Sequence, residues 1–188
     1  AGRALEGRLL YALTAYEAID DDSIIPDRFV VDWVTPLTSY CDDLEITRAD
    51  NGRGSRLGYK TNRPVADINA DMGKLRRRTI RLDRDATQRH ADVAAEAFAG
   101  LLPVEIGRAG TMYSDGITNR AVHLMGMQEL YLQMALDPAA VHRLLSFLAE
   151  DSMALGQWEE EQGLLTLNHD GNQGYCTGST LYSDETAC

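Results

Sequence analysis

The chain has 188 residues, of which 44% are hydrophobic and 25% charged, and its formal net charge at pH 7 is −11. This length suits one domain with its own core, and the composition excludes a chain that is disordered throughout. Three cysteines are too few for a disulfide scaffold, and no run approaches the ~20 apolar residues of a membrane-spanning helix. We therefore expect a globular protein of the cytoplasm with no membrane partner.

The charge is unevenly distributed along the chain. Residues 1–94 hold 15 basic and 16 acidic side chains, whereas residues 95–188 hold 3 and 13. Between Arg48 and Arg84 there are 11 basic and 4 acidic residues. No runs of aromatic side chains alternate with these arginines, and the chain as a whole repels phosphate, so we expect no nucleic-acid partner. The basic segment is either solvated or faces an acidic surface or an anionic small molecule.

Apolar residues near the start of the chain predict a helix and then a strand. Residues 3–19 carry an apolar face with helical spacing. That face consists of Leu5, Leu9, Leu13 and Tyr16. Three aspartates at residues 20–22 oppose the helix dipole and should end the helix. Residues 29–34 are mostly β-branched or aromatic and predict a buried strand, which Pro36 closes.

The middle of the chain predicts a short strand at residues 57–61, a small helix at residues 70–75 and then a longer helix. The longer helix is expected to begin at Asp85, with Gln88 completing a capping pair, and to end at Gly100. Its expected buried residues are Val93, Ala94, Ala97 and Phe98. Another strand is predicted directly after this helix.

Helices and strands continue to alternate in the second half. Residues 101–106 predict a strand, residues 118–136 predict a helix broken near Gly126, and residues 164–168 predict another buried strand. Strands of five or six apolar residues that alternate with helices are typical of a parallel sheet. Because both the glycine-rich dinucleotide fingerprint and the P-loop are absent, we favour part of a (β/α) barrel over a nucleotide-binding sheet.

A long helix is predicted before the last of these strands. Asp137 is its expected N-cap, Pro138 its first residue and Gly163 its stop signal. One apolar face runs along it for about six turns. This face consists of Val141, Leu144, Leu148, Leu155 and Trp158.

Four segments follow one another in an order that resembles a known family. They are LLPVEI at residues 101–106, GMQEL at 126–130, DPAAVHRLLSFL at 137–148 and EQGLLTLN at 161–168. Their order and spacing resemble the uroporphyrinogen decarboxylase superfamily, which also contains methylcobalamin:coenzyme M methyltransferases and cobalamin-independent methionine synthases. The resemblance is closest to a branch of large homologues. It covers most of the chain and is strongest from Asp85 to Asp184.

The resemblance implies an α/β fold of the (β/α)8 TIM-barrel type. Such a barrel needs about 250 residues, and this chain is shorter and has about four barrel-type strands. We therefore expect the N-terminal half of a barrel, as a single domain over residues 1–188. Residues 1–27 would form the N-terminal helix and lead-in, and residues 28–188 the barrel strands and helices.

Barrel chemistry lies at the carboxyl ends of the strands, which selects three places in this sequence. The candidate binding residues are Asp32 and Trp33 after the first strand, Arg108, Met112 and Tyr113 after the strand at 101–106, and His169 after the last strand. Asn168 and Asp170, beside that histidine, are the candidate catalytic residues, because a carboxylate next to an imidazole offers an acid, a base or a ligand.

Each of these candidates also has a purely structural explanation. Asn168 and Asp170 are residues that cap loops through Asx turns. Arg108 is suited either to a substrate carboxylate or to a salt bridge inside the barrel. Asp32 is suited either to a pyrrole or corrinoid ligand or to an ion pair with an arginine. The sequence leaves these alternatives open.

No metal site is expected within this chain. His169, Cys176 and Cys188 match no short zinc-binding spacing. The resemblance implies zinc and a corrinoid only in the complete protein, because the zinc ligands of the related methyltransferases lie in the other half. The decarboxylases carry an arginine-rich MRQAGRY segment after their first strand, where residues 31–36 here read VDWVTP. This difference argues against porphyrinogen decarboxylation.

The resemblance therefore implies part of a corrinoid-linked methyltransferase in one-carbon metabolism, which binds a small-molecule or corrinoid-protein substrate and is inactive alone. One alternative is a uroporphyrinogen decarboxylase-type lyase. Another is a non-catalytic subunit or fragment that serves assembly. The expected protein partner is either a second copy of the chain or a C-terminal partner half.

Overall fold

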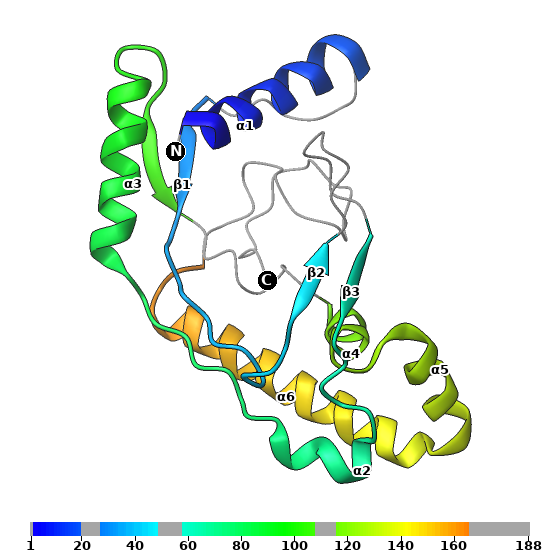
Figure 1. The fold of residues 1–188 in the computed structure, drawn as a ribbon. Helices are drawn as coiled ribbons and strands as arrows, with labels where there is room; N and C mark the ends of the chain where they lie inside the picture. Colours follow the sequence, from blue (N-terminus) through cyan, green and yellow to red (C-terminus); the bar gives the residue numbers. More distant parts are fainter. Residues whose placement is uncertain (1, 20–26, 49–57, 108–115, 166–188) are drawn as a thin grey trace. The chain divides into compact units, whose positions relative to one another are not determined.

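The computed structural model describes residues 2–19, 27–48, 58–107 and 116–165 (Figure 1). The fold is mixed α/β: within these residues, the strands form two separate two-stranded sheets and no closed barrel. The elements are α1 (Gly2–Thr14), the π-helical turn η1 (Ala15–Ile19), β1 (Phe29–Asp32), β2 (Ile46–Arg48), β3 (Tyr59–Thr61), α2 (Ile68–Asp71), the 3-10 turn η2 (Met72–Lys74), α3 (Arg84–Ala97), β4 (Val104–Gly107), α4 (Ile117–Met125), α5 (Met127–Leu136) and α6 (Pro138–Glu161).

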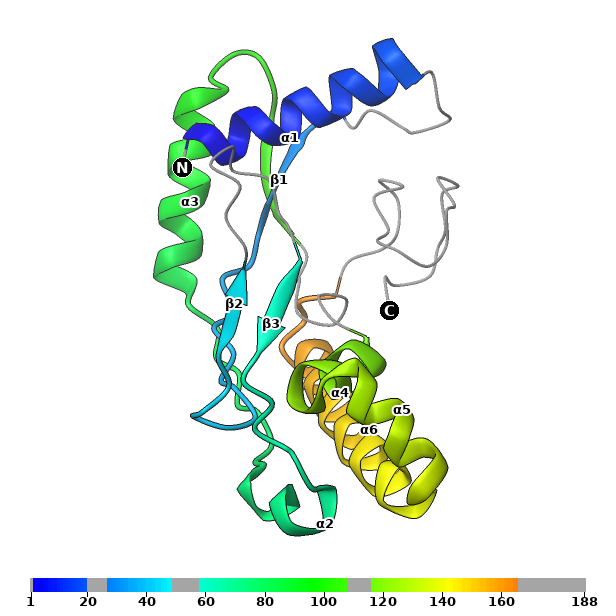
Figure 2. The same ribbon diagram turned by 45° about the vertical axis from the view of Figure 1, so that its right-hand side comes forward.

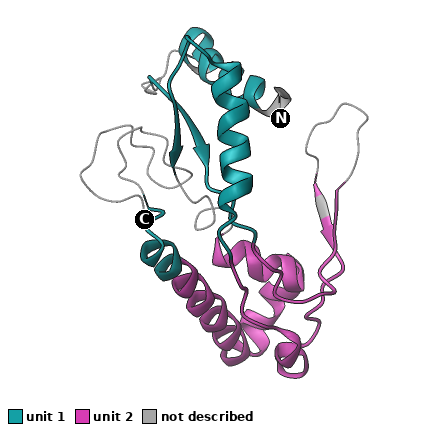
Figure 3. Ribbon diagram, turned by 90° about the vertical axis from the view of Figure 1, so that its left-hand side faces the viewer, with its two compact units in different colours: residues 1–36, 81–113, 156–188 teal, residues 37–80, 114–155 magenta. Residues whose placement is uncertain are grey.

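The chain divides into two compact units (Figure 3). Unit 1 consists of residues 1–36, 81–113 and 156–188, and unit 2 of residues 37–80 and 114–155. No helix in the described part of the chain is both long enough and apolar enough to cross a membrane.

Unit 1 is built on a parallel pair of strands. β1 pairs with β4 in the register Phe29 opposite Val104 and Asp32 opposite Gly107, and helix α3 lies between them in sequence. Phe29 and Val31 alternate into the core, as expected for a strand with one buried face. The rings of Phe29 and Phe98 lie 4.7 Å apart between their centroids. The predicted strands near residues 29–34 and 101–106 are thus confirmed, and they are hydrogen-bonded neighbours.

Helix α3 begins two residues earlier than predicted. Asp83, not Asp85, is the N-cap, and its Oδ1 accepts the backbone N–H of Ala86 at 2.9 Å. The expected buried face was wrong in part, since the side that faces the sheet carries small residues. Thr87, Ala91, Ala94 and Phe98 are buried. Val93 is 45% exposed and Ala97 is also exposed, because both project from the other side of the helix.

The predicted N-terminal helix is confirmed as α1 followed by η1. Its apolar face is only partly covered. Leu5 and Leu9 pack on the core of unit 1, whereas Leu13 and Tyr16 are 48% and 62% exposed. The expectation of one buried face along the whole helix was therefore wrong for its second half. The β1–β4 sheet and α3 contact only the first turns.

Unit 2 contains a small antiparallel strand pair, and its apolar core comes mainly from α2, α4, α5 and α6. β2 pairs with β3, with Ile46 opposite Thr61. Strand β2 was not predicted, because its three residues are all exposed and give no apolar alternation. The small helix predicted at residues 70–75 is confirmed as α2 and η2, although it begins at Ile68.

The helices of unit 2 follow the predicted breaks closely. Gly126 ends α4 and precedes α5 with φ +85°, a conformation that favours glycine. Asp137 caps α6 through a hydrogen bond from the backbone N–H of Ala140 to its Oδ1, at 3.0 Å. Figures 1 and 2 both show α5 alongside α6. On the predicted face of α6, four residues are buried and Trp158 is half-buried.

The helix α6 ends near the predicted stop signal, where Gly163 has φ +66°. Leu164 is buried just beyond it, and Leu164 and Leu165 form no strand. The remaining residues of the strand predicted at 164–168 lie outside the part of the chain that the structure describes.

Candidate functional site

The carboxyl ends of β1 and β4 form the described part of the site that the sequence predicts. Because the two strands are parallel, both end at the same edge of the sheet. Asp32, the last residue of β1, is exposed and pairs with Gly107, the residue that precedes Arg108. Ligand sites of open parallel sheets and barrels lie at this edge. Asp32 thus has the position that a ligand-binding carboxylate needs.

The backbone after Asp32 is tied to the start of helix α3. The Val34 N–H donates to Thr87 Oγ1 at 3.0 Å, and the Thr87 hydroxyl donates to the Asp83 carbonyl at 2.8 Å. The Asp83 N–H returns to the Val34 carbonyl at 2.8 Å. Thr87 is fully buried, so these bonds are shielded from water. The residues next to Asp32 are therefore held in a defined position.

Trp33 is half-buried, and the side chain of a cation lies over its ring. The guanidinium carbon of Arg84 lies 5.5 Å from the ring centroid, within cation–π range. Arg84 is the first residue of α3, so the contact again joins the end of β1 to the start of that helix. The sequence predicted Trp33 as a binding residue and did not point to Arg84.

The other predicted site residues fall outside the described residues and stay predictions. They are Arg108, Met112, Tyr113, Asn168, His169 and Asp170. Within the ranges that the structure describes, no three His, Cys, Asp or Glu side chains form a group that could hold a metal ion. Cys41 is buried, and burial raises the pKa of its thiol.

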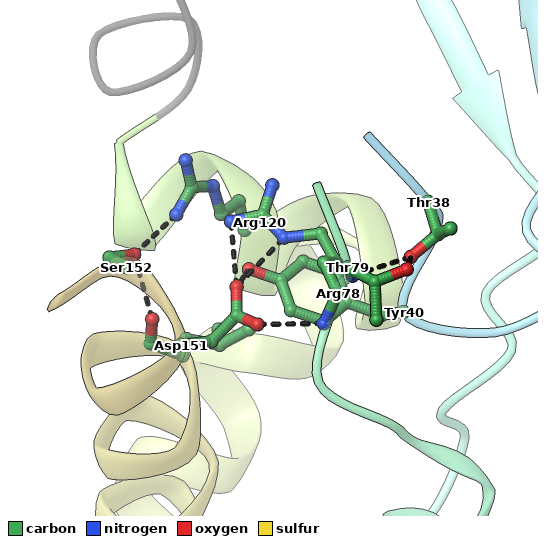
Figure 4. A network of polar contacts seen from close by, with 8 residues as sticks. Thr38, Tyr40, Arg78, Thr79, Arg120, Asp151 and Ser152 are labelled. Carbon is green, nitrogen blue, oxygen red and sulfur yellow. Dashed lines mark hydrogen bonds and ion pairs between the residues drawn. The ribbon is translucent and has the colours of Figure 1, made fainter. Parts of the chain in front are cut away.

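A second polar site, in unit 2, was missed by the sequence analysis (Figure 4). We call it the ionic cluster, and its members are Tyr40, Arg78, Arg120, Asp151 and Ser152. All but Ser152 are less than one-tenth exposed, counting the side chain alone for Arg78. Charged groups buried to this degree are uncommon in protein cores. The cluster therefore requires an explanation of its own.

Asp151 is the centre of the ionic cluster. Its Oδ1 accepts the backbone N–H of Arg78 at 2.8 Å, and its Oδ2 accepts Nε of Arg78 at 2.8 Å. The Tyr40 hydroxyl donates to the same Oδ2 at 2.9 Å. Loss of water contact raises the pKa of Tyr40 to about 12, against the opposing effect of the two arginines. Both oxygens of Asp151 are thus occupied, and its charge neutralises Arg78.

Arg120 differs from Arg78 in its partners. Its Nη1 donates to Ser152 Oγ, and the Ser152 hydroxyl donates to the carbonyl of Leu148 at 2.8 Å. The buried Nε of Arg120 has no hydrogen-bond partner. Among the residues that the structure describes, no carboxylate forms an ion pair with Arg120. The cluster therefore holds two guanidinium groups for one carboxylate.

A sequence signal for the ionic cluster does exist. Asp151 lies on the predicted apolar face of α6, at helical spacing from Leu148 and Leu155. Arg120 lies beside Ala121 and Leu124, which are fully buried in α4. A charged residue on the apolar face of a helix is a signal for a buried ionic group, and the sequence analysis did not use it.

The basic segment of the sequence is partly neutralised within the fold. Arg76 pairs with Asp42, Arg77 with Glu150, and Arg78 with Asp151. These three consecutive arginines therefore face acidic side chains of the same unit. Arg76 and Arg77 are also more than half exposed, so these two are solvated as well as paired, and what the basic segment as a whole faces stays a prediction.

Comparison with known proteins adds nothing to these observations: no family model, no curated protein and no solved structure matches the chain.

Proposed function

We propose that this chain is a uroporphyrinogen decarboxylase-like protein and part of a corrinoid-linked methyltransferase of cytoplasmic one-carbon metabolism. The observation that supports it best is the parallel pairing of β1 with β4, with α3 directly before β4. The connection from β1 to β4 also contains β2, β3 and α2, and a parallel strand pair with a helix in its crossover is the repeat from which a (β/α)8 barrel is built. The four sequence segments that resemble the family lie in the same chain order. We propose the N-terminal half of such a barrel as the finer fold.

In this proposal the chain contributes ligand binding rather than complete chemistry. Asp32 and Trp33 stand at the carboxyl end of β1, and Arg84 covers the ring of Trp33. An exposed carboxylate beside an aromatic ring suits a large ligand that carries amide donors, as a corrinoid does. In the complete protein, zinc would activate the thiol acceptor. A second copy or a C-terminal partner half would supply the remaining strands.

Binding of methylcobalamin to the purified chain tests the proposal. Isothermal titration should show binding, and Asp32→Asn should weaken it roughly tenfold, since a carboxylate that accepts a hydrogen bond is lost. The matched control is Asp92→Asn, an exposed aspartate of α3 in the same unit. It should bind as the unaltered chain does.

The titration also separates the alternatives. Binding of uroporphyrinogen in place of methylcobalamin would favour the lyase. Binding of neither compound would refute a ligand-binding role for the chain, and a stable assembly would then favour the non-catalytic subunit. Equal losses in the two aspartate variants would place the ligand away from the end of β1.

A further inference from the structure

Helix α5 of unit 2 exposes most of its apolar side chains. Within this fully described helix, Leu130 is the one buried residue. The large apolar side chains that remain exposed are Met127, Tyr131, Leu132, Met134 and Leu136. A helix that is apolar on most sides is normally covered, and a contiguous exposed apolar patch marks an interaction site. The role of α5 is independent of the methyltransferase proposal.

Three of these side chains lie on one face of α5, which we call the methionine face. Met127, Tyr131 and Met134 recur at positions i, i+4 and i+7, so they follow one another along the same side of the helix. Each is more than half exposed. Methionine is flexible and adapts to the shape of a bound side chain, and tyrosine supplies a large apolar surface. The methionine face therefore suits the apolar side of another helix.

The size of the methionine face fits one helix better than a second copy of the chain. A helix of ten residues is about 15 Å long. Stable dimers bury roughly 800 Å² on each partner, which one face of so short a helix does not provide. A single partner helix needs only the i, i+4 and i+7 positions as anchors.

The charge around the methionine face favours a basic partner. α5 contains no basic residue, and Asp137 follows its last turn. The hydrogen bond from Asn69 lowers the pKa of Asp137, and the carboxyl end of a helix adds a partial negative charge. The chain has a net charge of −11, so it attracts a cationic partner and repels a second copy of itself. Helices that lie on membranes carry Lys and Arg on their polar face, which α5 does not.

We propose that the methionine face of α5 is the docking site for a basic amphipathic helix of a partner protein. The apolar side of that helix packs on Met127, Tyr131 and Met134, and its Lys or Arg side chains lie toward Asp137. Docking removes exposed apolar surface from water and brings opposite charges together.

The first test uses a synthetic amphipathic peptide of leucine and lysine, about 14 residues or roughly four turns long, as the probe. The full chain is labelled with carbon-13 at its methionine methyl groups, and the signals are assigned from single substitutions. The peptide should shift the signals of Met127 and Met134 in a saturable way and leave that of Met153, an exposed methionine of α6, in place. A peptide with glutamate at each lysine position is the matched control and should shift none of them.

A double variant gives the second test. Met127→Gln with Met134→Gln removes two anchors at exposed positions, so the fold should be retained, which circular dichroism checks. The affinity for the leucine–lysine peptide, measured by fluorescence anisotropy, should fall roughly tenfold. Met153→Gln is the matched control and should change it less than about twofold.

Several results would overturn the proposal. They are unshifted Met127 and Met134 signals with the leucine–lysine peptide, equal binding of the glutamate peptide, and equal losses in the double variant and its control. Shifts of the same two signals when the chain alone is concentrated would assign the methionine face to a second copy. Shifts on addition of phosphatidylcholine vesicles would assign it to a membrane surface instead.

Discussion

The sheet core of unit 1 and the helical core of unit 2 differ in where they place ionised groups, although unit 1 also contains Glu159 of α6, which is fully buried. In unit 1 the core of the sheet and α3 consists of apolar side chains, and Asp32, Arg28 and Glu105 remain exposed. In unit 2 an apolar core of similar kind lies beside the buried Arg78, Arg120 and Asp151. The comparison teaches that the charged groups beside the strands of unit 1 stay in contact with water, whereas the buried Arg78 and Asp151 of unit 2 are paired with each other within the fold.

Loss of Asp151 should have the largest effect on stability. Asp151→Asn leaves Arg78 charged and buried without a counter-ion, so we expect a loss of about 3–5 kcal/mol in the free energy of unfolding. Urea denaturation of the purified variant measures it. Glu150→Gln breaks the exposed ion pair with Arg77 and should cost less than about 1 kcal/mol. Similar losses in both variants would contradict a structural role for the ionic cluster.

In unit 1, a substitution of Thr87 tests the hydrogen bonds that tie the end of β1 to α3. Thr87→Val keeps the shape of the side chain but leaves the Val34 N–H without its acceptor, so a loss of about 1–3 kcal/mol is expected. Thr14→Val, which removes an exposed hydroxyl in α1, should change stability by less than about 0.5 kcal/mol. If Thr87→Val is as mild as its control, the end of β1 is not tied to α3 as described.

Substitution of two glycines by alanine should change the stability of the fold in opposite directions. At Gly126, φ is +85° and an added Cβ would lie 2.8 Å from Nε of Arg63. Gly126→Ala should therefore destabilise unit 2 by about 1–2 kcal/mol. Gly7 lies in α1 with open space around it, so Gly7→Ala should stabilise unit 1 by about 0.5–1 kcal/mol. Thermal melts of both variants provide the measurement, and equal signs would refute the described backbone at one of the two positions.

The smallest expected effect concerns acid stability. Backbone N–H groups of Asp67 and Ala66, together with Lys74, lower the pKa of Asp71 to about 2. A lowered pKa means that the carboxylate stabilises the fold above about pH 4, its range in the unfolded chain, and that this contribution is lost as the pH falls toward 2. Asp71→Asn should flatten the pH dependence of the urea midpoint between pH 4 and pH 2. An unchanged slope would show that Asp71 makes no such contribution.

The sequence predicted the elements whose signals are local. Gly126, Asp137 and Pro138 mark the breaks and starts of α4 to α6 at the positions observed. The apolar face of α6 was also predicted from the spacing of its residues, and four of those residues are buried. The N-cap of α3 was misplaced, since Asp83 and Asp85 are equally suited by type. The hydrogen bond between Asp83 and Val34, far apart in sequence, decides between them.

The candidate site was predictable only in part. Asp32 and Trp33 follow from the rule that ligands bind at the carboxyl ends of parallel strands. Arg84 contacts Trp33 from 51 residues away, and no local pattern indicates that contact. The same holds for Tyr40 and Asp151, whose hydrogen bond joins positions 111 residues apart. Pairings of this kind depend on the tertiary fold, which apolar periodicity does not specify.

Hydrogen exchange measured by mass spectrometry tests the central claim, that the ligand binds at the carboxyl ends of β1 and β4. The purified chain is exchanged with and without methylcobalamin. The account predicts protection in peptides that cover residues 29–36 and 104–107, and unchanged exchange in α5 and in the β2–β3 pair. Protection confined to the helices of unit 2, or no protection at all, would contradict it.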